Sequence, residues 1–340
     1  MKVAYTYNVR RTTPELGKGH QPDLEFDDPA VIDTIAKAIE KCGHTVLRIE
    51  ADDEAFTKLQ KHKDEIDIVF NTAEGIRGDA RESQIPLFCE MLGIPYSHSN
   101  PTTHAITLNK QFTKQILAQA GINVPQSIVI RSKTDVVPET IAFPVIVKPN
   151  NEGSSKGILD KSVVEDKKDL AERIEEISEN YSKEVLVEEF IDGREFTVAI
   201  LGNKNPRVLP IIEQKFDFLP EGMHHIASFE LKWVYEDALK NLEEAYTCPA
   251  NLTEEEKRMI EDTTVAVFGA LNCVDCSRVD YRMNREGKLY FIEINSLPGL
   301  NPDPKIISYF RLAASAAGMS FDELIAQILS EAILRYPHLS

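Results

Sequence analysis

The segment from residue 278 to residue 299 constrains the fold of this chain most, because polar and apolar residues alternate on both sides of a turn signal. Residues 284–287 end in a glycine, which can adopt the positive φ of a tight turn, so two antiparallel strands are expected to meet there. Side chains alternate between the two faces of a strand, so Leu289, Phe291 and Glu293 are expected to share one face. The segment therefore predicts a β-hairpin that carries charged side chains at its open end.

Three oxygen-bearing side chains gather on one face of this predicted hairpin. If the hairpin closes symmetrically, Arg278 lies opposite Glu293, Asp280 lies opposite Phe291, and Asn295 follows on the same face. Alternating polar residues often form only a solvated face, but Glu293 and Asn295 interrupt an apolar strand in which an unpaired carboxylate is costly to bury. Mg²⁺ binds a few carboxylates and completes its shell with water and phosphate. Asp280, Glu293 and Asn295 are therefore interpreted as a metal site.

Length and charge limit the class of protein. With 340 residues, the chain is long enough for two or three packed units. A formal net charge of −17 argues against nucleic acid and anionic membrane as partners. No apolar run approaches the roughly 18 residues of a membrane span, and the first residues favour a strand over a signal peptide, so a cytoplasmic location is expected. The C-x-x-C pair Cys273 and Cys276 is interpreted as structural.

The first hundred residues indicate a parallel βαβ arrangement. Apolar periodicity predicts strands over residues 2–7, 44–49 and 66–71, and a helix over residues 29–42. Strand, helix and strand at this spacing favour a parallel sheet. The polar residues 8–28 form a loop of a length that is usual for functional or disordered segments.

The rest of the chain contains a glycine–serine loop, Asn-Asn-Glu-Gly-Ser-Ser-Lys-Gly, at residues 150–157. It follows an apolar strand that ends in Lys148, and it could cover phosphates with backbone N–H groups and hydroxyls or be an ordinary hairpin tip. Lys110 and Lys114 share one face of a predicted helix, a pattern that is most often solvated. Helices are expected over residues 86–93, 107–121, 167–179, 253–271, 305–317 and 320–334, and a strand pair over residues 185–191 and 194–201.

Taken together, these stretches resemble the ATP-grasp superfamily and, within it, the D-alanine–D-alanine ligases. Residues 148–157 resemble the family's lysine and mobile phosphate-covering loop. Residues 188–195, Glu-Glu-Phe-Ile-Asp-Gly-Arg-Glu, resemble its adenine and ribose segment, and residues 278–280 with 293–299 resemble its metal site. The likeness extends over most of the chain.

The resemblance implies an α/β (α+β) ATP-grasp fold in three parts. These are an N-terminal parallel βαβ substrate domain (1–109), a small central domain (110–195) and a C-terminal metal and substrate domain (196–340). It also implies a carboxylate–amine ligase: ATP phosphorylates one carboxylate, an amine attacks the acyl-phosphate, and an amide, ADP and phosphate result. ATP and two Mg²⁺ ions, with Mn²⁺ as a substitute, are the implied cofactors.

The resemblance also assigns roles to residues of this sequence. The catalytic set is Arg278, Lys232, Ser155 and Gly299, in which Arg278 and the Gly299 N–H would hold the oxyanion of the tetrahedral intermediate. The nucleotide set is Lys110, Lys148, Ser154, Ser155, Glu188, Glu189, Phe190, Ile191, Glu195 and Lys232. Within it the lysines and serines would meet the phosphates, Glu188 and Phe190 the adenine, and Glu195 the ribose.

Departures from the family's pattern fall at substrate positions. The family's Gly-Gly-x-Ser after the first strand is missing, and Glu25 or Asp27 is the loose match for the glutamate that orients the first substrate's amino group. Glu74 stands where the family has a histidine, Trp233 where it has a tyrosine, and Lys305 follows a proline where a small hydroxyl residue is expected. Glu25, Glu74, Trp233 and Lys305 are therefore the candidate substrate residues.

Three functions remain open. The first is a ligase of the D-alanine–D-alanine type whose amino-acid pair the sequence does not fix, and the second is the same machinery joining an amino acid to another small acid in secondary metabolism. The third is a nucleotide-binding module without catalysis, against which the intact Lys148, Lys232 and Arg278 argue. The expected partners are small-molecule amino acids or carboxylic acids, and a homodimer is compatible with the chain.

Overall fold

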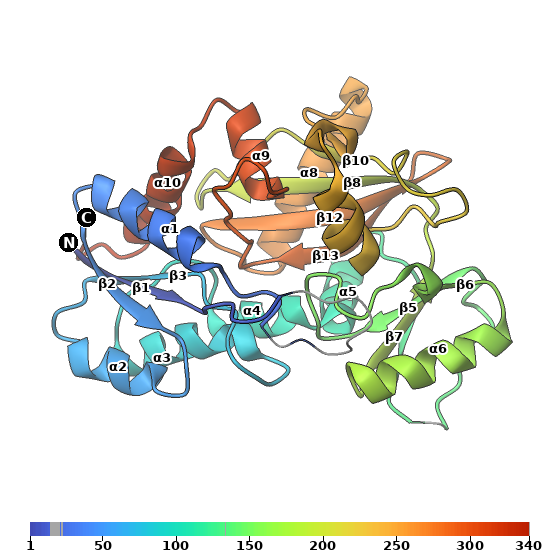
Figure 1. Ribbon diagram of the computed structural model, residues 1–340, viewed down its shortest axis with the longest axis horizontal. Coiled ribbons are helices and arrows are strands. Elements are labelled where there is room, and N and C mark those ends of the chain that lie inside the picture. Colours follow the sequence, from blue (N-terminus) through green and yellow to red (C-terminus); the bar gives the residue numbers. More distant parts are fainter. Residues whose placement is uncertain (14–20, 22, 133, 340) are drawn as a thin grey trace.

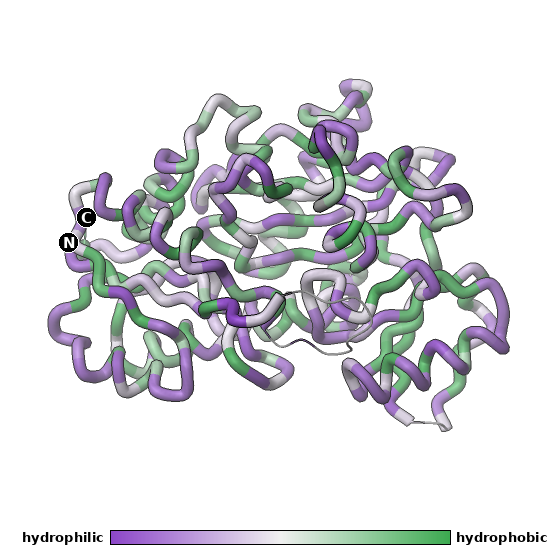
Figure 2. Tube along the Cα trace, in the orientation of Figure 1, coloured by the Kyte–Doolittle hydropathy of each residue, from purple (hydrophilic) through white to green (hydrophobic). Residues whose placement is uncertain are grey.

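The computed structural model describes residues 1–13, 21, 23–132 and 134–339, which form three β-sheets flanked by helices. In Figure 1 the N-terminal sheet lies at the lower left, the central sheet at the lower right, and the largest sheet above both. In Figure 2 apolar stretches lie mainly toward the interior, and hydrophilic residues cover much of the outer turns. This mixed α/β architecture confirms the expected fold class.

The N-terminal sheet is parallel, with strand order β2-β1-β3. Along β1, Val3 and Tyr5 pack toward α1, whereas Ala4 packs toward α2 and α3, because successive side chains point to opposite faces. The predicted parallel βαβ unit is therefore confirmed. Its elements are β1 (Lys2–Tyr7), α1 (Pro29–Lys41), β2 (Thr45–Glu50), α2 (Ala55–His62), β3 (Ile68–Asn71) and α3 (Gln84–Leu92).

The central sheet is antiparallel, with strand order β4-β7-β5-β6. Its apolar face packs against α6, where Leu170 and Ile177 meet Val145 and Val147 in one core. The Asp166 side chain caps α6 by accepting hydrogen bonds from the first turn. The elements are β4 (Ser127–Ile130), β5 (Val145–Pro149), β6 (Val163–Val164), α6 (Lys167–Asn180) and β7 (Val185–Glu189).

The largest sheet has the strand order β11-β10-β8-β12-β13, and β9 also pairs with β8. Apolar residues of α8, such as Ile260 and Val267, cover its face together with Leu117 of α5. The strands are β8 (Gly193–Leu201), β9 (Arg207–Val208), β10 (Ile212–Gln214), β11 (Tyr246–Thr247), β12 (Cys276–Asn284) and β13 (Leu289–Asn295). The remaining α-helices are α4 (Pro101–Leu108), α5 (Lys110–Gln119), α7 (Glu236–Ala238), α8 (Glu254–Ala270), α9 (Tyr309–Ala316) and α10 (Phe321–Leu334). The short 3-10 helices are η1 (Arg81–Ser83), η2 (Asp160–Ser162) and η4 (Leu242–Glu244), and η3 (Leu231–Tyr235) is a π-helix.

Two predicted elements differ from the structure. The helix expected over residues 107–121 is broken at Asn109, which adopts an extended conformation and caps α5 with its side chain. The strands over residues 185–191 and 194–201 do not pair with each other. Instead β7 lies in the central sheet and β8 in the largest sheet, so residues 190–192 carry the chain from one sheet to the other.

The hairpin of β12 and β13 forms, but its predicted register is wrong. Its turn spans Asn284 to Lys288, with Gly287 at a φ of 79°, one residue longer than expected. A β-bulge then adds Ile292 to β13, so that Asp280 lies opposite Glu293 and Arg278 opposite Asn295.

The same two shifts change which side chains share a face of β13. Leu289 and Phe291 lie in the core with Ile294, and not on the face of Glu293 as predicted. A one-residue shift in register, such as that of the longer turn, moves the side chains of a strand to the opposite face of the sheet. The second shift, at the bulge, moves them back. Asp280, Glu293 and Asn295 therefore still point to one side.

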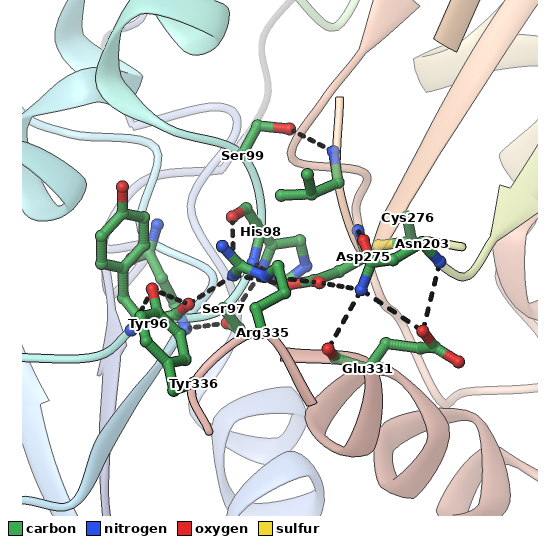
Figure 3. A network of polar contacts seen from close by, with 12 residues as sticks. Tyr96, Ser97, His98, Ser99, Asn203, Asp275, Cys276, Glu331, Arg335 and Tyr336 are labelled. Carbon is green, nitrogen blue, oxygen red and sulfur yellow. Dashed lines mark hydrogen bonds and ion pairs between the residues drawn. The ribbon is translucent and has the colours of Figure 1, made fainter. Parts of the chain in front are cut away.

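A buried polar network joins the C-terminal helix α10 to the N-terminal sheet and to the largest sheet (Figure 3). The Asp275 carboxylate, 0% exposed, accepts hydrogen bonds from Arg335 at 2.9 Å, from the His98 N–H at 2.7 Å and from Asn203 at 3.0 Å. Arg335 also donates to the Tyr96 carbonyl. These contacts fix the loop after α3 against the base of the largest sheet.

Within the described residues, no single helix is both long and apolar enough to cross a membrane. The pair α9 and α10 passes that test together by length and composition, but it is bent by 101° at its break.

Candidate active site

Three adjoining cavities lie where the three sheets meet, and Lys232 and Arg278 line all of them. Every residue that the sequence singled out as a site candidate lines at least one cavity. The first, between the central and largest sheets, contains Lys148, Ser155, Glu188, Glu189, Phe190, Ile191, Glu195, Asp280 and Glu293. The second contains Glu25, Ser154, Trp233, Gly299 and Lys305, and the third contains Glu25, Glu74, Lys110, Ser154, Glu293, Asn295 and Gly299. The structure thus brings the candidates together, and their individual roles stay predictions.

Two lysines hold the carboxylate of Glu188 inside the first cavity. Lys114 lies 2.8 Å from one carboxylate oxygen and Lys148 lies 2.5 Å from the other, and Glu188 is 1% exposed. Burial opposes ionisation, but the two lysines outweigh it and lower the pKa of Glu188. Lys114, which the sequence pattern suggested was solvated, is buried because it pairs with this carboxylate. Both oxygens of Glu188 are therefore engaged before any adenine amino group could reach them.

Arg282 was not among the predicted site residues, although it alternates with Arg278 and Asp280 along β12. Its guanidinium lies 3.3 Å from Glu195 and 4.9 Å from the centre of the Phe190 ring. Burial raises the pKa of Glu195, and Arg282 counteracts that effect. Arg282 thus fixes the two side chains expected at ribose and adenine. The period-two spacing of the strand was the signal that could have identified it.

Asp280 and Glu293 form the carboxylate pair at the boundary of the first and third cavities. Burial would raise the pKa of Glu293, but Lys110 and three further cations outweigh it and lower the pKa to about 2. Lys110 lies 3.4 Å from Glu293, and Arg278 lies 3.2 Å from Asp280. The Glu293 carboxylate is therefore ionised at neutral pH, and the Asp280 carboxylate is paired with Arg278.

These residues suit Mg²⁺ bound together with phosphate, and do not suit a preformed cage. No group of three or more His, Cys, Asp or Glu side chains in the described part of the chain is arranged to hold a metal by itself. Asp280, Glu293 and the Asn295 amide supply hard oxygen ligands on one face of the hairpin. Mg²⁺ characteristically takes one or two carboxylates and completes its octahedron with phosphate and water. The donor set fits that ion.

The glycine–serine loop adopts a constrained backbone over the cavities. Ser154 and Ser155 have φ values of 49° and 57°, a left-handed conformation that non-glycine residues rarely adopt and that is common at functional sites. The Ser155 hydroxyl donates to the Ala227 carbonyl at 2.6 Å, and the Trp233 indole N–H donates to the Ser154 carbonyl at 3.5 Å. The loop is thus held over the site by contacts to η3 and to the segment before it.

A cluster of four charges also ties this loop to the N-terminal segment. Glu25 pairs with Arg81 and Lys156, both at 2.8 Å, while Glu152 lies 3.3 Å from Arg81. A Cβ on Gly153 would lie 2.1 Å from the Glu25 carboxylate, so only glycine permits this approach. Arg81 and Lys156 were not predicted, because their partner comes from a segment more than fifty residues away.

Comparisons with known proteins agree with this architecture. Residues 116–330 match the family model described as the D-ala D-ala ligase C-terminus. The chain is 34% identical over 322 residues to the uncharacterized protein y4sG of Sinorhizobium fredii, covering 93% of this chain and 91% of that one. It is 31% identical over 299 residues to a D-alanine–D-alanine ligase of Aquifex aeolicus, covering 87% and 92%. A solved D-alanine–D-alanine ligase of Bacillus anthracis complexed with ATP has a TM-score of 0.73 at 24% identity, with 98% of both chains covered.

Fold, cavities and comparisons define an ATP-grasp enzyme, an ATP-dependent ligase that forms C–N bonds. More particularly, the chain belongs to the D-alanine–D-alanine ligase family.

Proposed function

We propose that this protein is an ATP- and Mg²⁺-dependent carboxylate–amine ligase that joins two small amino acids, as its relatives named for D-alanine do. The observation that carries the proposal is the junction of three cavities at Lys232 and Arg278. A nucleotide, an acid and an amine each need a compartment, and their reacting atoms must meet at one point. The two shared cations lie at that point.

The first step is phosphoryl transfer from ATP to the acid. It requires positioning and neutralisation of charge more than covalent chemistry from the protein. Lys110, Lys148 and Lys232 would contact the phosphates, and the backbone of the glycine–serine loop would cover them. Asp280, Glu293 and Asn295 would hold Mg²⁺, which when bound supplies further neutralisation of the phosphate oxygens.

The second step is attack of the amine on the acyl-phosphate, which breaks the C–O bond to phosphate and forms the amide. Arg278 lies at the junction and is held by Asp280, with its guanidinium 6.0 Å from the centre of the Tyr309 ring. Gly299 lines the second and third cavities and carries a backbone N–H. These two donors would stabilise the oxyanion that develops on the carbonyl.

A ligase of the same machinery that uses another small acid or amine is the second candidate. The observation that favours it is the size of the second cavity, about 350 Å³ against about 140 Å³ for the third. Trp233 and the exposed Lys305 line this larger space. An amine substrate bulkier than alanine would fill it better.

Phosphate release from ATP and Mg²⁺ in the presence of single and paired amino acids tests the function. D-alanine alone supporting release identifies the first candidate, and release only with a second acid or amine identifies the other. No release with any pair would favour a nucleotide-binding module without catalysis. The three-domain division, a cytoplasmic location and a homodimer stay predictions.

A further inference from the structure

The third cavity has opposite charges in two separate places. The charges that act most strongly on Glu293 are Lys110, Lys232, Lys148 and Arg278. Those that act most strongly on Glu74 are Glu25, Glu82, Arg81 and Asp27. Since both glutamates line the same cavity, it has a cationic side next to the proposed phosphate site and an acidic side at the end of β3. A ligand with a carboxylate and a separate positive charge would match this distribution.

Glu25 is already neutralised and is not available to such a ligand. Its carboxylate is 7% exposed and pairs with Arg81, which is 9% exposed, and with Lys156, which is 3% exposed. Its other close neighbour is Gly153 of the glycine–serine loop. A cationic substrate would have to displace two buried cations, each of which would then lose its partner at considerable cost. Glu25 therefore holds the glycine–serine loop in its closed position.

Glu74 has the properties that Glu25 lacks. Among the described residues, no side chain or backbone group donates a hydrogen bond to its carboxylate or forms an ion pair with it. Burial raises the pKa of Glu74 well above its usual range, and the Glu25 and Glu82 carboxylates raise it further. A positive charge beside Glu74 would relieve both effects.

The backbone around Glu74 is fixed in advance. Gly75 donates its N–H to the Asn8 side chain at 3.1 Å and has a φ of 80°. A Cβ at that position would lie 2.1 Å from the Arg81 carbonyl oxygen. On the other side of Glu74, the Ala73 N–H is held by the Asn71 side chain at 3.1 Å. The carboxylate is thus presented from a rigid turn, which lowers the entropic cost of binding.

We propose that Glu74, rather than Glu25, holds a positively charged nitrogen of the acid substrate and so selects acids that carry an ammonium group. The proposal rests on the ligase function proposed above. Glu82, which also lines the cavity and lies 3.8 Å from the buried His104, adds negative charge to the same side. The substrate's carboxylate then lies toward Lys232 and Arg278, where the phosphoryl group arrives.

Calorimetric titration of the full chain with saturating ADP and Mg²⁺ tests this contact. The probes are D-alanine, L-alanine and propionate, which is alanine without its ammonium group. The wild type is expected to bind one enantiomer of alanine at least about tenfold more tightly than propionate. Glu74→Gln keeps the shape and removes the charge, so it is expected to weaken alanine by roughly 10- to 100-fold, the range of a lost charge-assisted hydrogen bond. Propionate binding is expected to stay within about twofold.

Glu25→Gln is the matched control. It is expected to preserve the preference for alanine and to change the fluorescence of Trp233, the only tryptophan, which contacts the loop that Glu25 holds. The proposal is overturned if the wild type shows no preference for alanine over propionate, if the preference survives Glu74→Gln, or if Glu25→Gln alone removes it. A preserved preference without phosphate release for any pair of acid and amine would instead refute the ligase function.

Discussion

Among single residues of the site, Glu293 is the carboxylate on which four cations act. It is the counter-charge to Lys110, Lys232, Lys148 and Arg278, which keep its pKa near 2. Glu293→Gln retains the shape but removes the charge, so the concentration of Mg²⁺ needed for half-maximal turnover is expected to rise at least about 10- to 100-fold, the loss seen even for partners one layer from a metal. Titration of phosphate release with Mg²⁺ measures this.

The control for that variant lies in the same hairpin. Glu286→Gln changes an exposed glutamate in the β12–β13 turn and is expected to leave the Mg²⁺ requirement unchanged. Equal Mg²⁺ requirements for Glu293→Gln and the wild type would remove Glu293 from the metal site.

Asp27 makes the stability of the ligand-free protein depend on pH. Burial and the Asp28 charge raise its pKa to about 7, although Arg10 opposes them. Since the unfolded carboxyl titrates near 4, the folded state binds more protons between pH 4 and 7, and stability falls as pH rises through that window. Asp27→Asn is therefore expected to raise the melting temperature by a few degrees at pH 8 and by almost nothing at pH 4.

Asp28→Asn provides the comparison, because it removes a carboxylate that pairs with Arg10. It is not expected to stabilise the protein at either pH. A pH-independent gain in Asp27→Asn would show that its carboxyl titrates normally.

The residue types of the site could be predicted from the sequence, and several of their partners could not. Asp280, Glu293 and Asn295 were identifiable because a buried strand rarely carries such side chains without a purpose. Glu25 and Glu74 were also identifiable as candidates. The sequence did not show that Glu25 is paired with cations whereas Glu74 is not. That difference depends on Arg81 and Lys156, which lie on other segments and reach Glu25 only after folding.

At the scale of elements, local patterns predicted most helices and strands, the parallel N-terminal unit and the β12–β13 hairpin, but not the partners of β7 and β8 or the register of the hairpin. The strands that became β7 and β8 are adjacent in sequence and read as a hairpin, yet each one completes a different sheet. The bulge at Ile292 was equally invisible, because no glycine or proline marks it. Pairing and register depend on which surfaces the packed sheets leave open, and that information is not local.

The contact between α10 and the two sheets leads to a stability prediction. Arg335 is the cation beside the fully buried Asp275, at the centre of the network in Figure 3. Arg335→Met leaves that carboxylate buried without a cation, which typically costs about 3–5 kcal/mol. Chemical denaturation is expected to show a loss of that size, and adding Asp275→Asn is expected to recover part of it.

An exposed pair offers the matched control. Arg285 and Asp192 lie 2.6 Å apart but are 82% and 54% exposed, so Arg285→Met is expected to cost less than about 1 kcal/mol. Similar losses for Arg335→Met and Arg285→Met would mean that the buried network contributes no more than a surface pair.

For the molecule as a whole, we expect the charge cluster of Glu25, Arg81, Glu152 and Lys156 to control how often the glycine–serine loop opens. It joins the N-terminal segment, the turn after β3 and the glycine–serine loop, which come from separate parts of the chain. If nucleotide binds in the first cavity as proposed, it has to enter under this loop, and the closed arrangement then has to break transiently. Breaking these ion pairs is therefore expected to release the loop from the N-terminal segment and from the turn after β3.

Trypsin can report that opening at a single bond in the loop. Residue 148 precedes a proline, which leaves Lys156, 3% exposed when closed, as the one cleavable lysine or arginine between residues 148 and 157. When reclosing is faster than cleavage, the rate of cutting follows the open population. Arg81→Met removes one of the two cations on Glu25 and one partner of Glu152. If that costs about 3 kcal/mol, cleavage after Lys156 is expected to rise by roughly 100-fold.

ATP with Mg²⁺ is expected to slow the cleavage in both proteins, because ligand binding to the closed form reduces the open population. Arg77→Met is the control: it lies in the same turn, but its ion pair with Asp53 is 75% and 77% exposed, so cleavage after Lys156 should match the wild type. Cleavage of Arg81→Met at the wild-type rate, with its melting temperature unchanged, would show that the indole and hydroxyl contacts of Trp233 and Ser155 alone hold the loop closed.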